Sequence, residues 1–222
     1  YMDNYNYHKG MNGIIQELKC LLKTKNIGTD SDQALLLDFQ AALETKPEKA
    51  IKLEKDALAQ IENITADNAR LVSNLHANLG GLYRMNGHPD LAREHMEKSI
   101  SLLDQFNLLH INDSIPQIAN YAMFLTEQQE PERGISELQK LSGIIKEYHS
   151  DDCLDYAKVQ ETLGTIYLMT ANLPQAKTHF KRAFKIYEKI WADEPEMIEA
   201  KYQEIQELYP QIGFCIGKNL SG

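Results

Sequence analysis

Apolar side chains recur along the chain three and four residues apart. Between residues 66 and 85, Leu71, Val72, Leu75, Leu79 and Leu82 follow the spacing of an amphipathic helix. The same pattern predicts helices over residues 12–25, 32–44, 48–61, 91–106, 115–129, 131–148, 154–170, 174–191 and 196–208. Strand-type alternation is absent, so the pattern predicts an all-α protein.

The breaks between these helices return at a fixed interval of 42 residues. Pro47, Pro89 and Pro131 share this interval, and each stands where a helix is expected to begin. A small residue that follows a bulky one keeps the same interval at three positions: Gly80, Ala122 and Gly164. A period of this length predicts stacked copies of one helix pair, none of which can bury its apolar face alone.

Two local features refine the helix ends and contacts. Asp151 and Asp152 precede the helix expected at residue 154, and we interpret them as candidates for its N-cap. Gly80 lies inside a predicted helix, so we expect it to allow close approach of the partner helix rather than to form a phosphate loop.

The repeated positions resemble a known signature. Leu79-Gly80, Tyr83, Ala92 and Met96 resemble the tetratricopeptide repeat, and a further copy matches it closely with Leu163-Gly164, Tyr167, Ala176 and Phe180. The third copy is similar, with Tyr121-Ala122, Leu125, Gly134 and Leu138. The first copy departs from the signature twice. Asp38 replaces the small residue and Glu54 replaces the large apolar residue.

The length of the repeat narrows the resemblance. An ordinary repeat of this family has about 34 residues. The 42-residue copies here resemble the kinesin light chain subclass, in which an asparagine precedes the bulky and small pair. Asn78 and Asn120 hold that position, whereas the fourth copy has Thr162.

The resemblance implies a right-handed α-α superhelix, or solenoid, of about four helix pairs with flanking capping helices. We expect an N-terminal tail and capping helix in residues 1–29. The four pairs are expected at about 30–64, 65–108, 114–150 and 152–192, within residues 30–192. Residues 193–222 are expected to form a C-terminal capping helix and tail. The apolar stripe of the first pair, which includes Leu35 and Phe39, is either covered by the N-terminal helix or open as an anchor site.

The resemblance also implies where a partner binds. In this family the first helix of each pair lines a concave groove, where an asparagine amide can pair with both the C=O and the N–H of an extended peptide. The groove residues expected on this basis are Asn74, Asn78, Arg84, Met85, Asn120, Met123, Glu127, Lys158, Glu161, Thr162, Thr165 and Met169. The alternative is that Asn78 and Asn120 satisfy groups of the adjacent helices and touch no ligand.

Two functions of different class remain open. One is a non-catalytic module that binds a peptide or partner segment. The other is a ligand- or peptide-sensing domain of a larger bacterial-type regulator. An enzyme is disfavoured because no nucleophile, base or metal cluster is recognisable, and no cofactor is expected. The seven histidines show no metal-ligand spacing, so we expect no metal site.

Composition limits the partners and the cellular location that we expect. The net charge is −9 and no block of Lys and Arg occurs, which disfavours binding to nucleic acid. The apolar runs are too short to span a membrane, and no signal segment opens the chain, so we expect a cytoplasmic protein. Three scattered cysteines, Cys20, Cys153 and Cys215, are interpreted as reduced packing residues. The first residue is Tyr1, which suggests a fragment of a longer chain. The oligomeric state does not follow from the sequence.

Overall fold

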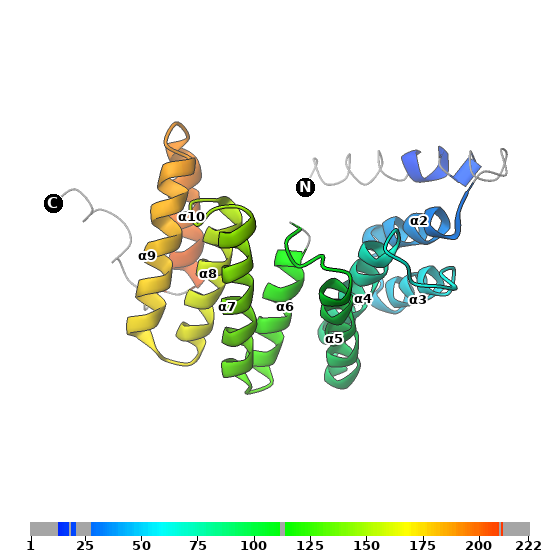
Figure 1. The fold of residues 1–222 in the computed structure, drawn as a ribbon, viewed down its shortest axis with the longest axis horizontal. Coiled ribbons are helices and arrows are strands. Elements are labelled where there is room, and N and C mark those ends of the chain that lie inside the picture. The colour runs from blue at the N-terminus through cyan, green and yellow to red at the C-terminus, as the bar shows by residue number, and fades with distance from the viewer. Residues whose placement is uncertain (1–12, 18, 21–27, 112–113, 209, 211–222) are drawn as a thin grey trace. The chain divides into compact units, whose positions relative to one another are not determined.

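The structure, a computed structural model, describes residues 13–17, 19–20, 28–111, 114–208 and 210. Its helices are α2 (Asp30–Leu43), α3 (Pro47–Leu58), α4 (Ala69–Met85), α5 (Pro89–Gln105), α6 (Ser114–Glu127), α7 (Pro131–Tyr148), α8 (Leu154–Met169), α9 (Leu173–Ile190) and α10 (Pro195–Leu208) (Figure 1). Residues 13–17 and 19–20 are also helical. Within these described ranges there is no β-strand, so the predicted all-α class is confirmed.

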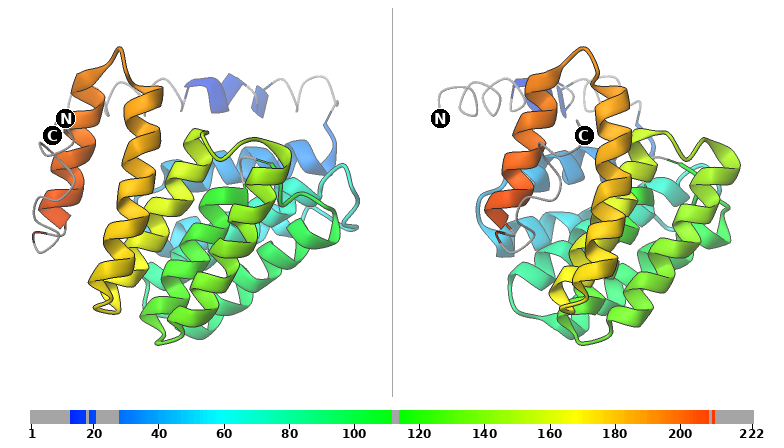
Figure 2. Two further views of the ribbon diagram at one scale, coloured as in Figure 1. Left: turned by 60° about the vertical axis from the view of Figure 1, so that its left-hand side comes forward. Right: turned by 90° about the vertical axis from the view of Figure 1, so that its left-hand side faces the viewer.

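The chain divides into two compact units, which are described separately. The first, Tyr1–Leu108, contains the helix pairs α2/α3 and α4/α5. The second, Leu109–Gly222, contains the pairs α6/α7 and α8/α9 and the single helix α10. In each pair the second helix packs against the first, and α10 runs back beside α9 (Figure 2).

The predicted terminal helices are only partly within the described residues. Of the helix expected over residues 12–25, positions 12, 18 and 21–25 lie outside them. The C-terminal helix is present as α10, whereas Cys215 and the tail expected after this helix lie outside the described part of the chain apart from Pro210.

The turns inside three of the pairs share one geometry. Gly87, Gln129 and Ala171, 42 residues apart, all have a positive φ, of 74°, 64° and 59°. In each turn the next N–H reaches back to a carbonyl five residues earlier, which closes the helix in the Schellman manner. These bonds are His88 N to Tyr83 O at 2.9 Å, Glu130 N to Leu125 O at 2.8 Å and Asn172 N to Tyr167 O at 2.7 Å. The period is therefore present in the backbone conformation as well as in the side chains.

Three of the second helices begin at a proline. Pro47, Pro89 and Pro131 occupy the first turn of α3, α5 and α7, where a missing N–H costs no hydrogen bond.

The predicted N-cap of α8 is wrong. Cys153, directly before Leu154, is the N-cap, and its Sγ accepts a bond from Tyr156 N at 3.4 Å. Asp152 instead pairs with Lys189 of α9, because it lies one residue too early to reach the free N–H groups of the first turn.

Close contact between the helices of a pair depends on small residues at the signature positions. A Cβ added to Gly80 would lie 2.6 Å from Met96 Cγ, and one added to Gly164 would lie 2.9 Å from the Phe180 ring. The predicted packing role of Gly80 is thus confirmed. Phe180, Leu138 and Leu163 are almost completely buried in the second unit, and Leu75 and Leu79 in the first. In the described part of the chain, no helix is both long and apolar enough to cross a membrane.

Candidate functional site

The first helices of neighbouring pairs contact one another directly inside each unit. In the first unit α2 contacts α4, and in the second α6 contacts α8. The second helices α3 and α7 lie between successive pairs, because each packs against its own first helix and against the next one. We call the exposed sides of these first helices the α2/α4 face and the α6/α8 face. All the expected groove residues lie on α4, α6 and α8, and none lies on α2.

On α4 the expected residues differ in solvent exposure. Met85, the last residue of the helix, is 81% exposed, and Asn78 is exposed. Asn74 and Arg84 are half-buried and already interact with other groups of the chain. On α2, which the expected set did not include, Leu35 and Phe39 are 40% and 37% exposed. Ile15 of the N-terminal helical segment is also buried, at 2% exposed, so both possibilities for the first apolar stripe stay predictions.

The structure brings together Asn78 and the two residues that depart from the repeat signature. Asn78 Nδ2 donates to Asp38 Oδ1 on α2 at 2.8 Å and to Glu54 Oε1 on α3 at 3.2 Å. We call Asp38, Glu54 and Asn78 the acid cluster. It replaces the packing contact that Gly80 makes with Met96 and that Gly164 makes with Phe180. Both N–H bonds of the Asn78 amide are used within the chain, so the amide cannot also donate to a peptide carbonyl.

Two carboxyl groups this close cannot both carry a full charge. Glu54 is buried, and this burial together with the charge of Asp38 raises the pKa of Glu54 to about 9. Burial also raises the pKa of Asp38, against the opposing effect of its hydrogen bonds. At neutral pH Glu54 therefore keeps its proton. The second oxygen, Glu54 Oε2, has no hydrogen-bond partner within the described part of the chain.

On the α6/α8 face, the α6 residues are the more accessible. Asn120 and Glu127 are exposed, and Met123 is half-buried. On α8, Lys158 is exposed and lies 4.0 Å from Asp155, and Met169 is 46% exposed.

Two threonines of the expected set use their hydroxyls internally. Thr162 donates to Lys158 O at 2.9 Å, and Thr165 donates to Glu161 O at 3.1 Å. Thr165 is also 9% exposed, so its hydroxyl is not available to a ligand.

Glu161 already has partners within the chain. Lys201 of α10 pairs with Glu161 Oε1 at 2.8 Å, and the Tyr187 hydroxyl donates to Oε2 at 2.6 Å. Burial lowers the pKa of Lys201, but its bonds to Glu161 and Glu204 outweigh this effect and raise it overall. Burial and the Glu161 charge raise the pKa of Tyr187. Tyr202 of α10 stacks on Phe184, with ring centroids 4.3 Å apart. Helix α10 thus packs against α9 of the last pair. Its Lys201 occupies the carboxylate of Glu161 that we expected a ligand to contact.

Sequence reasoning missed a pair of equivalent histidine contacts. His95 Nδ1 lies 2.9 Å from His76 Nδ1, and His179 Nδ1 lies 2.9 Å from Gln160 Oε1. Both the partners and the histidines are 84 residues apart, which is two repeats, so a search at that interval would have found them. Burial lowers the pKa of His76 to about 4 and also lowers the pKa values of His95 and His179.

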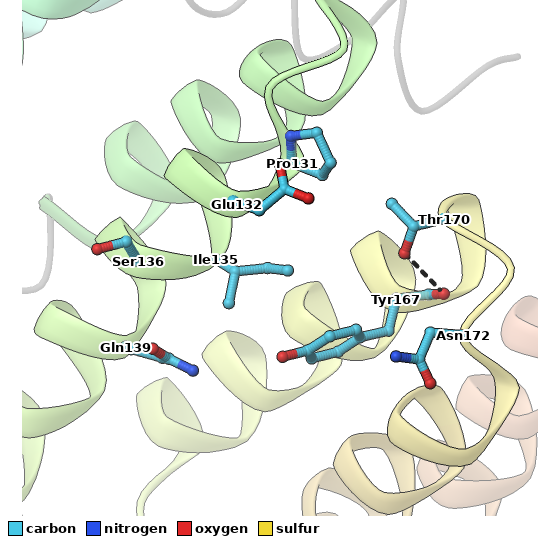
Figure 3. Close-up of a pocket in the computed structure, with 8 residues that line it drawn as sticks. All are labelled: Pro131, Glu132, Ile135, Ser136, Gln139, Tyr167, Thr170 and Asn172. Atoms are coloured by element: carbon cyan, nitrogen blue, oxygen red, sulfur yellow. Dashed lines mark hydrogen bonds between the residues drawn. The ribbon is translucent and has the colours of Figure 1, made fainter.

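One hollow lies between α7 and the end of α8. It has a volume of about 460 Å³, and Ile135, Gln139 and Tyr167 point toward its centre (Figure 3). Its walls carry no cluster of titratable groups, since Glu132 is the one acidic residue among those that line it. Within the described residues, no group of three or more His, Cys, Asp or Glu side chains is arranged to hold a metal ion.

Comparisons with known proteins agree with this architecture. Residues 114–189 match a tetratricopeptide repeat family. The crystal structure of BtubC (BKLC) from P. vanneervenii has a TM-score of 0.67 and 19% identity, over 82% of this chain and 72% of that one. A Podosopora anserina kinesin light chain structure with nearly identical TPR-like repeats has a TM-score of 0.67 and 12% identity, over 85% of this chain and 92% of the other.

A more distant fold match is the MamA crystal structure, with a TM-score of 0.55 and 16% identity over 84% of this chain and 94% of that chain. A search of curated proteins by sequence gave no match. The fold is thus the tetratricopeptide-type α-α superhelix, and the Podosopora anserina structure is described as a kinesin light chain. The chain thus has the fold of tetratricopeptide repeat proteins, and its residues 114–189 match the model of that family.

Proposed function

We propose that this chain binds an extended peptide segment of a partner protein along the exposed faces of its first helices. The tetratricopeptide fold is consistent with a protein-interaction scaffold. The observation that carries the finer proposal is the direct contact between successive first helices, α2 with α4 and α6 with α8. This contact produces continuous faces on which side chains repeat at a regular interval. We assign no catalytic step to the chain.

The α6/α8 face has the groups that an extended peptide needs. Asn120 is exposed, and an amide can donate to a backbone carbonyl and accept from a backbone N–H. Met123 and Met169 supply flexible apolar contacts that adapt to different side chains. Glu127 and Lys158 supply opposite charges on the two helices, which would favour one direction of the peptide.

The acid cluster changes what we expect of the asparagine ladder. Since both Asn78 N–H bonds go to Asp38 and Glu54, Asn78 would offer a peptide only its carbonyl oxygen. An alanine at position 78 would therefore disturb the buried Glu54 as well as a ligand contact. Asn120 is the better residue with which to test peptide binding.

The test begins with peptides selected from a random displayed library on the intact 222-residue chain. Their affinity is then measured by fluorescence anisotropy for Asn120→Ala and Lys158→Ala. We expect each change to weaken binding at least tenfold, with the melting temperature within about 2 °C of wild type because both side chains are exposed.

Lys181→Ala is the matched control, because Lys181 is exposed and lies on the second helix α9 rather than on a first helix. It should bind with wild-type affinity. Equal losses in Lys181→Ala and Lys158→Ala, or full binding by Asn120→Ala, would contradict the proposal.

A further inference from the structure

We propose that the acid cluster of Asp38, Glu54 and Asn78 is a recognition site for a cationic side chain, best an arginine, of the bound peptide. This inference rests on the proposed function and adds the chemistry of one peptide residue to it. It concerns the first unit alone.

The hydrogen-bond inventory of the cluster is the first argument. The Asn78 amide has two N–H bonds, and they point to Asp38 Oδ1 and Glu54 Oε1. What the cluster can still offer to a ligand is acceptors: the Asn78 carbonyl oxygen and the second oxygen of Asp38. A guanidinium group has five donors and no acceptor, so it is the complementary side chain.

An unsatisfied buried atom is the second argument. Glu54 is 2% exposed, yet its Oε2 has no hydrogen-bond partner among the described residues. A buried acceptor without a partner costs free energy, and such groups call for an explanation. A cation arriving from the α2/α4 face would displace the proton that Glu54 keeps at neutral pH and would then provide a partner for Oε2.

Access and charge are the third argument. Asn78 is exposed and Asp38 is half-buried, so the cluster opens on the α2/α4 face while Glu54 forms its floor. In the described part of the chain, no lysine or arginine forms an ion pair with Asp38 or Glu54. Lys55, the neighbour of Glu54 on α3, lies 5.5 Å from the Tyr83 ring centroid instead. The two carboxyl groups of the cluster are thus without an ion-pair partner among the described residues.

The surroundings suit the rest of an arginine side chain. Leu35 lies one helical turn before Asp38 and Phe39 directly follows it, and both are partly exposed. Apolar side chains here can pack on the aliphatic stem, and the Phe39 ring can face the cation. In the second unit a carboxylate on a first helix is paired with a cation of the same chain, since the Lys201 ammonium lies 2.8 Å from Glu161 Oε1.

The cluster is also a costly departure from the repeat. The equivalent positions hold Gly80 with Met96 and Gly164 with Phe180, which pack tightly. A carboxyl pair at this contact is less stabilising than apolar packing, and such exceptions to a local rule are expected at functional sites.

The experiment titrates the ¹⁵N-labelled intact chain with N-acetyl-arginine amide and follows the side-chain amide signals of Asn78 by NMR. N-acetyl-citrulline amide has the same shape without the charge and is the matched control ligand. We expect a saturable shift of the Asn78 signals with the arginine compound and none with the citrulline compound. Asp38→Asn, which keeps the shape of the side chain, should weaken arginine binding at least tenfold.

The pH dependence gives a second readout. The groups that face Glu54 from the helices packed on α3 are Asp38 of α2 and Asn78 of α4. Because the cation favours ionised Glu54, arginine affinity should rise at least threefold from pH 6 to pH 8.5. In Glu54→Gln this rise should be absent.

The inference fails if arginine causes no saturable shift, if citrulline acts equally, or if Asp38→Asn binds as wild type does. The comparison of the two ligands uses the wild-type chain, so it does not depend on the folding of a variant. Failure here with library peptides still bound through Asn120 would leave the proposed function intact. If the arginine compound binds but no peptide can be selected from the library, the proposed function is contradicted and this inference is not.

Discussion

Two equivalent histidines show how one side-chain contact recurs with different chemistry. His95 stacks on Tyr83 with centroids 5.4 Å apart, and His179 stacks on Tyr167 at 5.2 Å. The partner of the ring nitrogen is His76 in the first case and Gln160 in the second. A glutamine can accept from either a neutral or a charged imidazole, whereas two histidines cannot both be charged at 2.9 Å without repulsion.

The His76 pair should therefore make stability sensitive to acid. Its pKa in the folded state, about 4, lies below the ordinary value of 6.5, so the unfolded chain takes up the proton first. The contribution is complete above pH 6.5 and is lost as the pH falls toward 4. Relative to wild type, His76→Gln should be close to neutral at pH 7.5 and more stable by about 1 kcal/mol at pH 5, after allowing for partial exposure. Urea unfolding at the two pH values measures the difference.

The comparison with His76→Gln removes the contribution of every other titrating group, because these groups are present in both chains. Gln at position 76 reproduces the contact that Gln160 makes. A constant difference between the two chains from pH 7.5 to pH 5 would contradict the assignment of this pH dependence to the histidine pair.

At this scale the sequence predicted some roles and missed others. Asp38 and Glu54 were recognised as departures from the signature, but each was considered alone. Their positions are equivalent to those of Gly80 with Met96 and Gly164 with Phe180, which meet in two other pairs, so the repeat itself implies that the two carboxyls meet. The bonds of Asn78 could not be predicted, because they join three helices and depend on the stacking of the second pair on the first.

Among the described glycines, Gly134 of α7 lies closest to the backbone of a neighbouring helix. A Cβ at this position would lie 2.6 Å from Ala122 O of α6, and a backbone oxygen cannot turn away as a side chain can. Gly143, on the same helix, would place its Cβ in open space. The two glycines therefore allow a matched comparison.

We expect Gly134→Ala to destabilise the second unit by about 1–3 kcal/mol, because the two helices must separate. Gly143→Ala should instead stabilise it by about 0.5–1 kcal/mol, since alanine is the better helix former and meets no neighbour. Thermal unfolding followed by circular dichroism should show melting temperatures that move in opposite directions. Shifts in the same direction would mean that the α6/α7 contact tolerates separation.

The period predicted the helices well, but their ends depended on local bonds. Helix α4 begins at Ala69 rather than near residue 66, because Asn68 Oδ1 accepts from Thr65 N at 2.8 Å and holds a turn before the helix. Gln129 and Ala171 adopt the same left-handed conformation as Gly87, since the repeat imposes the turn even on residues that disfavour it. These differences are small shifts in helix limits, and the order of elements is as expected.

For the molecule as a whole, the two units carry different titrating groups. Glu54 lies in Tyr1–Leu108, and its pKa is raised from 4.5 to about 9, so the stability it contributes is present below pH 4.5 and is lost as the pH rises through 9. In Leu109–Gly222 the pKa values of Tyr187, Tyr202 and Lys201 are all raised and so lie further above this range.

Between pH 7 and pH 9, we expect the first unit to lose about 1–2 kcal/mol of opening free energy and the second to change much less. Hydrogen exchange, corrected for intrinsic rates and read by mass spectrometry for peptides of each unit, measures this difference. Glu54→Gln should remove it. Equal changes in the two units would show that Glu54 does not govern the alkaline response.

What the sequence could reveal at this scale was the repeat and its family. It could not reveal that α10 pairs with Glu161, because that contact depends on how α10 folds back on the fourth pair. On α8, Thr165 is buried and Glu161 is paired with Lys201, whereas on α2 Leu35 and Phe39 are partly exposed.

The Tyr83–His95 and Tyr167–His179 stacks have a practical consequence for protein engineering. The pairs α4/α5 and α8/α9 each contain this tyrosine–histidine stack, which we call the lock, at equivalent positions. They are therefore suitable units to exchange when chimeras are built. Exchange points placed 84 residues apart would carry each lock intact, whereas a junction between tyrosine and histidine would split it.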